Sequence, residues 1–201
     1  MPEPEITFSE EEKQPKKRED EFAMRLLKTR TILLAETVTK KLAEKCVSQL
    51  LLLEQDDADK EVKFFINSPG GDVDAGYAIF DMMRFVQPPI CTIAGGLCAS
   101  AAVVIFLAAK KERRFSLPNS RFLLHQPSTG VSGSASDVEI EAQEILKIRQ
   151  KINKLIADET GQPIAKVEKD TARNFWMGAE ESQKYGLLSR VIISRSELGN
   201  D

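Results

Sequence analysis

Residues 85–109 contain no charged side chain, and this stretch constrains the fold more than any other part of the sequence. An apolar stretch of this length is long enough to span a bilayer. However, Pro88 and Pro89 lie near its start and Gly95 and Gly96 in its middle, and these residue types interrupt a continuous helix. We therefore predict a buried strand, a tight turn at the two glycines and a core helix, rather than a transmembrane segment.

Strands and helices alternate on both sides of this stretch. Apolar residues recur at helical spacing in some segments, and short β-branched or aromatic runs lie between them. The predicted order is a helix at 39–54, a strand at 62–66, a helix at 75–86, a strand at 90–94, a helix at 101–109 and a strand at 121–124. This alternation predicts an α/β fold with a mostly parallel sheet flanked by helices.

The longest predicted helix follows a segment rich in Gly and Ser at residues 128–136. Asp137 is its predicted N-cap, and Val138, Ile145 and Ile152 mark one apolar stripe along it. A stripe of this length needs a partner to cover it. The remaining predicted elements are a helix from 163 to about 173, a helix at 178–185 and a last strand at 190–193.

Charge and cysteine content narrow the classes of function. The formal net charge of -3 leaves no basic surplus for binding a nucleic acid or an anionic membrane. Cys46, Cys91 and Cys98 are too irregularly spaced for a disulfide framework or a metal site. We expect them to be buried in the protein core as free thiols, which fits a reducing cytosol. We expect neither a metal nor a bound cofactor.

We predict one domain at residues 22–194, because a chain of 201 residues does not require a second core. Residues 1–21 are rich in Glu, Lys and Pro and are predicted to form a mobile charged arm, with a tail at 195–201. The arm lacks the basic start and apolar stretch of a secretory signal, so we expect a cytoplasmic protein.

Ser100 follows the Gly-rich turn and begins the core helix, which is a position suited to a nucleophile. A helix start has unpaired N–H groups, and the amide of Ala101 can stabilise an oxyanion there. A serine at this position can also be only an N-cap.

His125 is the sole histidine, and it follows a predicted strand. A second Gly turn at residues 67–71 reaches the same sheet edge and has amides that can meet a substrate.

Several segments match one family in order and spacing. They are residues 65–71 (Phe-Ile-Asn-Ser-Pro-Gly-Gly), 75–76 (Ala-Gly), 99–100 (Ala-Ser), 117–121 (Leu-Pro-Asn-Ser-Arg), 125–127 (His-Gln-Pro), 144–147 (Glu-Ile-Leu-Lys) and 160–163 (Thr-Gly-Gln-Pro). Together they resemble the signature segments of the proteolytic subunit of Clp protease, the ClpP family. The resemblance runs from about residue 21 to residue 193, which is most of the chain.

The resemblance implies a ClpP/crotonase-like fold with a protruding helical handle, and a serine endopeptidase that cleaves unfolded polypeptides to short peptides. It assigns Ser100 as the nucleophile, His125 as the general base, and the amides of Gly71 and Ala101 as the oxyanion hole. It also implies heptameric rings stacked as a tetradecamer through the long helix. An AAA+ Clp unfoldase would dock on these rings and would alone use ATP.

The chain departs from the family at the third triad position. The family has an aspartate shortly after a Thr-x-Arg, whereas this chain has Asn174. An asparagine oxygen can orient the imidazole but adds no negative charge to stabilise the imidazolium. We therefore expect a Ser-His-Asn peptidase of low intrinsic activity that can assemble with a more active paralogue. Asp170 is predicted to share a helical face with Asn174.

Leu97 and Ala101 replace the Gln and Met that are usual beside the nucleophile in the family, which changes the local pocket.

Three alternatives stay open. A catalytically deficient structural or regulatory ring subunit, assembled with an active paralogue, would also carry Asn174. A crotonase-like enzyme would share the fold but would need neither the serine before the helix nor the histidine at the strand end. A serine–lysine peptidase would use Lys110 or Lys111 as base, although both follow the core helix and are expected to be solvated.

Overall fold

The computed structural model describes residues 21–128, 130 and 132–199. The strands are β1 (Thr31–Leu34), β2 (Val62–Ser68), β3 (Ile90–Ala99), β4 (Arg114–Ser116), β5 (Arg121–Leu124), β6 (Phe175–Gly178) and β7 (Arg190–Val191). The helices are α2 (Lys40–Asp56), α3 (Val73–Phe85), α4 (Ala101–Phe106), α5 (Ala135–Thr160), α6 (Ile164–Thr171) and α7 (Ala179–Tyr185), with 3₁₀ turns at Lys111–Arg113 and Arg195–Leu198.

Residues 1–20 of the predicted arm at 1–21 lie outside the described residues, and residues 21–28 are helical. Near the other end, Leu198 is buried against Phe115 and Ile192. The domain boundaries at residues 21 and 194 stay predictions. No helix in the described part of the chain is long and apolar enough to cross a membrane.

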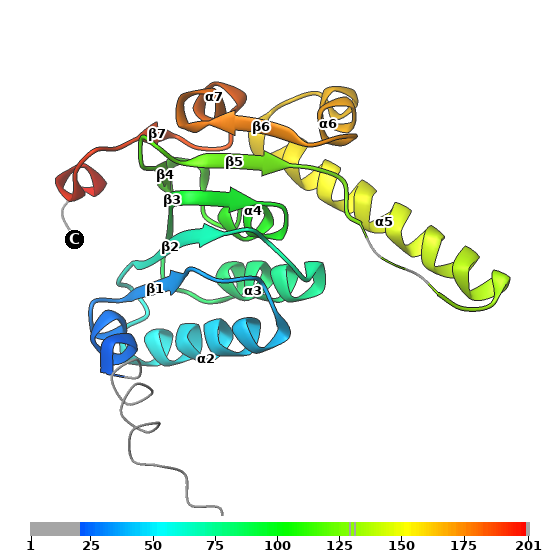
Figure 1. Ribbon diagram of the computed structural model, residues 1–201. Helices are drawn as coiled ribbons and strands as arrows, with labels where there is room; N and C mark the ends of the chain where they lie inside the picture. Colours follow the sequence, from blue (N-terminus) through cyan, green and yellow to red (C-terminus); the bar gives the residue numbers. More distant parts are fainter. Residues whose placement is uncertain (1–20, 129, 131, 200–201) are drawn as a thin grey trace, which may run out of the picture.

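The strands form one sheet in the order β1-β2-β3-β4-β7, and β5 joins the C-terminal part of β3. All strand pairs are parallel except β5 with β6 (Figure 1). Helices α2, α3 and α4 lie side by side, and their buried side chains form the main core with those of the sheet. The predicted α/β fold with a mostly parallel sheet flanked by helices is confirmed.

The predicted tight turn at Gly95 and Gly96 is wrong, because β3 continues through both glycines. Its ladder with β2 passes from the pair Ile66–Ala94 to the pair Ser68–Cys98, so two residues of β2 advance alongside four of β3. This bulge lets β3 change neighbours: residues 92–94 pair with β4, and residues 97–99 pair with β5. The pattern of a strand broken by glycines is typical of a bulge as well as of a turn.

The Asn67 side chain holds the bulge in place, since its Oδ1 accepts a hydrogen bond of 2.9 Å from the amide of Leu97. Gly96 at this point has φ of +105°, which is a conformation that side-chain-bearing residues rarely adopt. The bulge therefore depends on contacts between β3 and the end of β2, and not on β3 alone.

The core helix is shorter than predicted, because α4 ends at Phe106. Its C-terminal carbonyls are not capped by Lys110 and Lys111, which are exposed. Instead, Arg114 donates to the carbonyls of Leu107 and Ala109, at 3.0 and 2.8 Å. Guanidinium groups from other elements therefore replace the predicted local lysines.

Other short elements have different bounds from those predicted, or were not predicted at all. The prediction omitted strands β1, β4 and β6, which are each four residues long or shorter and therefore give only a weak periodic signal. The predicted last strand at 190–193 is limited to β7. Helix α5 is capped by Ser134 rather than Asp137, and the Asp137 side chain bonds back to Ser134 in a capping box.

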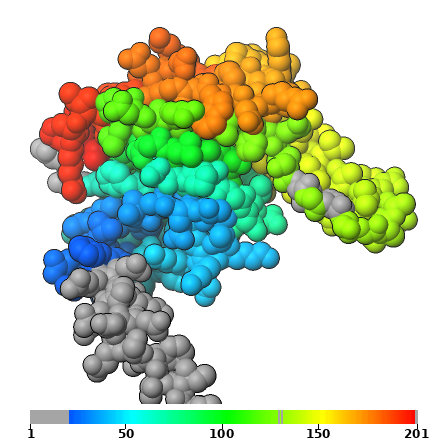
Figure 2. Space-filling view, viewed as in Figure 1, coloured from blue at the N-terminus to red at the C-terminus, as the bar shows by residue number. Residues whose placement is uncertain are grey.

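Helix α5 projects from the body of the molecule as the predicted handle (Figures 1 and 2). Its outer part exposes large apolar side chains, including those of Val138 and Leu146, which are 41% and 54% exposed. Its inner part packs on the core through Ile152 and Ile156. The predicted partner for the outer apolar stripe stays a prediction, and a single chain leaves that surface uncovered.

Replacing Gly96 by Ala should lower the free energy of unfolding by about 1–3 kcal/mol, because of its positive φ and a close contact. The added Cβ would lie 2.7 Å from Asn67 Oδ1. Chemical denaturation measures the change. Gly130→Ala is the control, since its Cβ would meet nothing within 4 Å and should change stability by less than about 0.5 kcal/mol. Equal effects of the two changes would contradict the role given to the bulge.

Candidate active site

Ser100 lies between β3 and α4 in a strained backbone conformation. Its φ is 56° and its ψ is −123°, which is unusual for a residue with a side chain. Such a conformation costs about 1–3 kcal/mol and is found preferentially at functional sites. The Ser100 amide donates to the carbonyl of Leu123 at 2.9 Å, which fixes the turn against β5. Its hydroxyl caps no helix within the described chain, so Ser100 does not act as an ordinary N-cap.

The second Gly turn packs directly against Ser100. A Cβ placed on Gly70 would lie 2.8 Å from Ser100 Cβ and 2.9 Å from the amide nitrogen of Ala101. The Val38 backbone holds this turn on both sides of Gly71, because its amide donates to Gly70 and its carbonyl accepts from Asp72, each at 2.9 Å. The two predicted oxyanion donors, the amides of Gly71 and Ala101, therefore belong to segments that touch each other beside Ser100.

His125 directly follows β5, and β5 pairs with the end of β3 that leads to Ser100. Both residues line one cavity of about 20 Å³. The rest of the lining is almost wholly apolar and consists of Val73, Ala101, Val103, Val104, Leu124, Pro127, Ile152 and Ile156. Burial lowers the pKa of the His125 imidazole below its ordinary range. The structure therefore brings a hydroxyl and a preferentially neutral imidazole to one apolar cavity.

Asn174 immediately precedes β6 and is exposed. In the antiparallel register Leu124 faces Phe175, so one further step would place His125 opposite Asn174. Two hydrogen bonds from Gln126 support this arrangement, from its amide to Thr171 O at 2.8 Å and from its side chain to Ala172 O at 3.1 Å. Within the described chain, however, no hydrogen bond joins His125 to Ser100 or to Asn174.

The predicted helical face shared by Asp170 and Asn174 is wrong. Helix α6 ends at Thr171, so Asn174 lies outside the helix. The Asp170 carboxylate accepts a hydrogen bond from Lys166 at 2.6 Å and another from the Tyr185 hydroxyl at 2.9 Å. Asp170 therefore joins α6 to α7. Its carboxylate is bonded to these partners and does not orient the His125 imidazole.

Neither lysine suggested as an alternative base lies at the cavity of Ser100. Lys110 and Lys111 follow the far end of α4 and line a separate cavity of about 600 Å³. All three cysteines are buried, and burial raises the pKa of the Cys46 thiol to about 12. The described residues contain no group of three or more His, Cys, Asp or Glu side chains that could hold a metal ion.

A family model described as Clp protease matches residues 13–195 of the chain. The chain belongs to the Clp protease family. A relative, the ATP-dependent Clp protease proteolytic subunit 2 of Treponema denticola, is 52% identical over 194 residues, which are 96% of this chain and 97% of the relative. The proteolytic subunit 3 of Rhizobium meliloti is 49% identical over 173 residues, which are 86% of this chain and 88% of the relative.

A solved structure of a ClpP family member agrees with the fold. It is an Asn-to-Asp mutant of ClpP1 from Listeria monocytogenes, with a TM-score of 0.82 and 43% sequence identity. The match covers 89% of this chain and 99% of the Listeria chain. The chain is thus a homologue of the proteolytic subunit of ATP-dependent Clp proteases, which are serine proteases, and not a crotonase-like enzyme.

Sequence reasoning named Ser100 and His125, the polar residues that line this cavity, but missed its apolar wall. Val73, Val104 and Ile156 come from three different helices, and nothing in their local sequence distinguishes them from other core residues. The signal that could have found two of them is helical spacing, because Val104 is four residues after Ser100 and Ile156 four after Ile152.

His125 should titrate below the ordinary histidine pKa of about 6.5, because burial disfavours its charged form. The neutral, proton-accepting form should therefore persist to a lower pH than for an exposed histidine. NMR of histidine-labelled protein can measure this without assignment, since the chain has a single histidine. In Asn174→Asp, the added negative charge should raise the pKa. A wild-type pKa at or above 6.5 would contradict the buried environment.

Proposed function

We propose that the chain is a serine endopeptidase subunit with Ser100 as the nucleophile and His125 as the general base. The shared cavity of Ser100 and His125 is the observation that carries the proposal. Ser100 Oγ attacks the peptide carbonyl while His125 accepts its proton. His125 then returns the proton to the leaving amine, and water hydrolyses the acyl-enzyme by the same steps. The amides of Gly71 and Ala101 hold the oxyanion that forms at the carbonyl oxygen.

Asn174 fills the third position of the triad in this proposal. Its carboxamide oxygen accepts a hydrogen bond from the imidazole and fixes the ring, but it adds no charge to balance the imidazolium. The register of β5 and β6 supports this role, since one step beyond the Leu124–Phe175 pair would place His125 opposite Asn174. The single chain does not make the bond, so we propose that ring assembly aligns the three residues. Intrinsic activity stays low even in the ring, because Asn174 carries no negative charge to stabilise the imidazolium.

The proposed assembly is a pair of heptameric rings stacked as a tetradecamer, either of this chain alone or mixed with a paralogous subunit. The exposed apolar residues on the outer part of α5 support it, because a second ring would cover them. An AAA+ Clp unfoldase would deliver unfolded polypeptides to the enclosed chamber, and only that partner would use ATP. The unfoldase comes from the family resemblance, and the names of the relatives, which are proteolytic subunits of ATP-dependent Clp proteases, support the use of ATP by a partner.

A catalytically deficient ring subunit is the second candidate function. Asn174 and the missing hydrogen bonds around His125 favour it, because both weaken the general base. Such a subunit would assemble with an active paralogue and shape its chamber. Peptide hydrolysis by the pure chain distinguishes the two functions.

Ser100→Ala should abolish hydrolysis of a fluorogenic peptide by the pure chain, because the nucleophile is lost. Asn174→Asp should raise kcat by up to about 10⁴, because it restores the charge that stabilises the imidazolium. Steady-state kinetics on assemblies of verified mass measure both changes. Asp170→Ala is the control for an acidic residue nearby and should affect turnover much less than either change. Hydrolysis that survives Ser100→Ala would overturn the proposal. Absence of peptide hydrolysis by both wild type and Asn174→Asp in intact rings would favour the catalytically deficient subunit.

Val138→Glu should divide the double ring into single rings, because it introduces a charge into the apolar stripe of α5. Native mass spectrometry measures the result. Gln143→Glu creates the same side chain elsewhere on the same exposed part of the helix and should leave the double ring intact. A double ring that survives Val138→Glu would contradict the proposed role of the stripe.

A further inference from the structure

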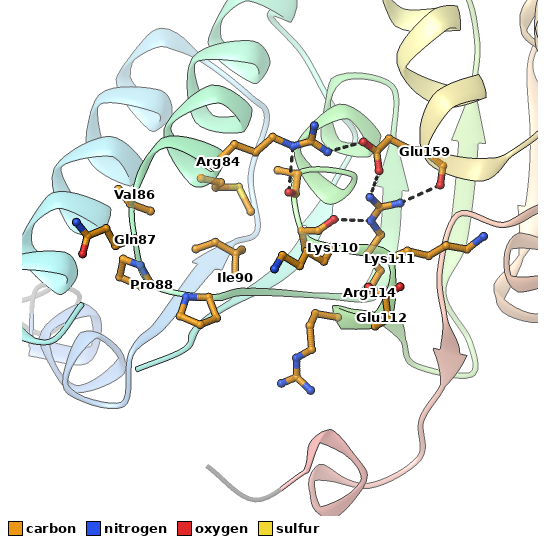
Figure 3. Close-up of a pocket in the computed structure, with 15 residues that line it drawn as sticks. Arg84, Val86, Gln87, Pro88, Ile90, Lys110, Lys111, Glu112, Arg114 and Glu159 are labelled. Carbon is orange, nitrogen blue, oxygen red and sulfur yellow. Dashed lines mark hydrogen bonds and ion pairs between the residues drawn. The ribbon is translucent and has the colours of Figure 1, made fainter. Parts of the chain in front are cut away.

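The C-terminal ends of three helices meet at one carboxylate, that of Glu159 (Figure 3). Glu159 is the penultimate residue of α5. Its carboxylate accepts a hydrogen bond of 2.5 Å from Arg84, which lies in the last turn of α3. The same carboxylate forms an ion pair with Arg114, at the start of β4. Arg114 also donates to the main-chain oxygen of Glu159 at 3.3 Å. Side-chain and main-chain bonds together therefore fix the last turn of α5.

The same two arginines bind the end of α4. Arg84 donates to Leu107 O at 3.1 Å and to Ala108 O at 3.3 Å, while Arg114 reaches Leu107 O and Ala109 O. The carbonyls at a helix C-terminus carry partial negative charge, and cations stabilise them. Glu159, Arg84 and Arg114, which we call the Glu159 clamp, therefore tie α3, α4 and α5 together at one end.

The Arg114–Glu159 pair of the clamp is poorly solvated, whereas the Arg84 side chain is 42% exposed. The Arg114 side chain is 1% exposed and that of Glu159 is 20% exposed. Burial opposes ionisation of Glu159, but the hydrogen bonds from Arg84 and Arg114 outweigh it and lower its pKa. A buried ion pair that loses one partner is strongly destabilised, because the other charge stays without compensation. The clamp is thus sensitive to the charge of Glu159.

The other parts of the same three helices wall the cavity of Ser100. Val73 is the first residue of α3, Ser100 immediately precedes α4, Val104 lies within α4, and Ile152 and Ile156 lie on α5. The width of the cavity therefore depends on how these helices are placed relative to one another. Its volume of about 20 Å³ leaves room for about one water-sized group.

We propose that Glu159 is a positioning residue that keeps the Ser100 cavity narrow and so selects peptides with a small side chain before the cleaved bond. The inference rests on the proposed function, in which Ser100 is the nucleophile. Glu159 lines the cavity at the far end of α4 and is absent from the lining of the Ser100 cavity, so it acts through the three helices.

The test compares two peptidyl diphenyl phosphonates that differ only in the side chain next to phosphorus, Ala in one and Phe in the other. Ser100 Oγ forms a bond to phosphorus, phenoxide leaves, and His125 transfers the serine proton to it. Labelling rates are measured on assembled wild type and on Glu159→Gln. The ratio of the Ala rate to the Phe rate should exceed one in wild type and fall about tenfold in Glu159→Gln, because a looser cavity admits the larger ring.

Glu61→Gln is the matched control. Glu61 is also a carboxylate bound by an arginine, Arg113, and its side chain is 15% exposed, but it lies outside the clamp. The ratio should be unchanged in this variant. A general loss of folded protein lowers both labelling rates equally, so the ratio separates a change in selection from a loss of stability. Arg84→Met, with a side chain that is 42% exposed, provides a second break of the clamp if Glu159→Gln fails to fold.

A ratio that stays the same when the clamp is broken, or that changes equally in Glu61→Gln, would overturn this inference and leave the proposed function intact. A wild-type ratio below one would also overturn it, since the cavity would then favour large side chains. No labelling of Ser100 in wild type would instead be a failure of the proposed function, and the inference would fall with it.

Discussion

The bulge in β3 determines where the candidate nucleophile lies. Because four residues of β3 advance alongside two of β2, the strand leaves β4 and continues beside β5. This change of neighbour brings Ser100, at the end of β3, next to His125, at the end of β5. The Asn67 side chain holds the bulge, and Gly70, three residues later, closes on Ser100. A local irregularity of the sheet thus assembles the candidate site.

The strained backbone at Ser100 needs support from the structure on both sides of it. All six residues of α4 are buried, and burial of a Val, Ile or Phe side chain contributes about 1.5–3 kcal/mol. The burial of Val103, Val104, Ile105 and Phe106 therefore exceeds the cost of one unusual φ, which is about 1–3 kcal/mol. The core that stabilises the fold also holds the serine in an orientation that leaves its hydroxyl without a capping bond.

Helix α5 links the candidate site to the rest of the molecule. Its inner part forms one wall of the Ser100 cavity, its last turn is fixed through Glu159, and its outer part exposes apolar side chains. A change in the position of this helix would alter the cavity and the exposed surface together. Helix α5 is also connected to the surroundings of His125 through Thr171. The Thr171 hydroxyl bonds to Asn153 of α5, and its carbonyl accepts a hydrogen bond from Gln126, the residue after His125.

The sequence by itself determined the alternation of strands and helices, the single histidine, the serine at a helix start and an asparagine, Asn174, where the family resemblance expects an aspartate. These depend on residue type and on spacing along the chain. Only the tertiary structure decided that Gly95 and Gly96 form a bulge, that arginines cap α4, and that Asp170 is bonded to α7. The bulge depends on Asn67, 30 residues before Leu97, and the end of α4 is capped in part by Arg84, 24 residues before Ala108. The Tyr185 hydroxyl that binds Asp170 comes from 15 residues further along the chain. Local pattern carries no information about such partners, because folding alone brings them into contact.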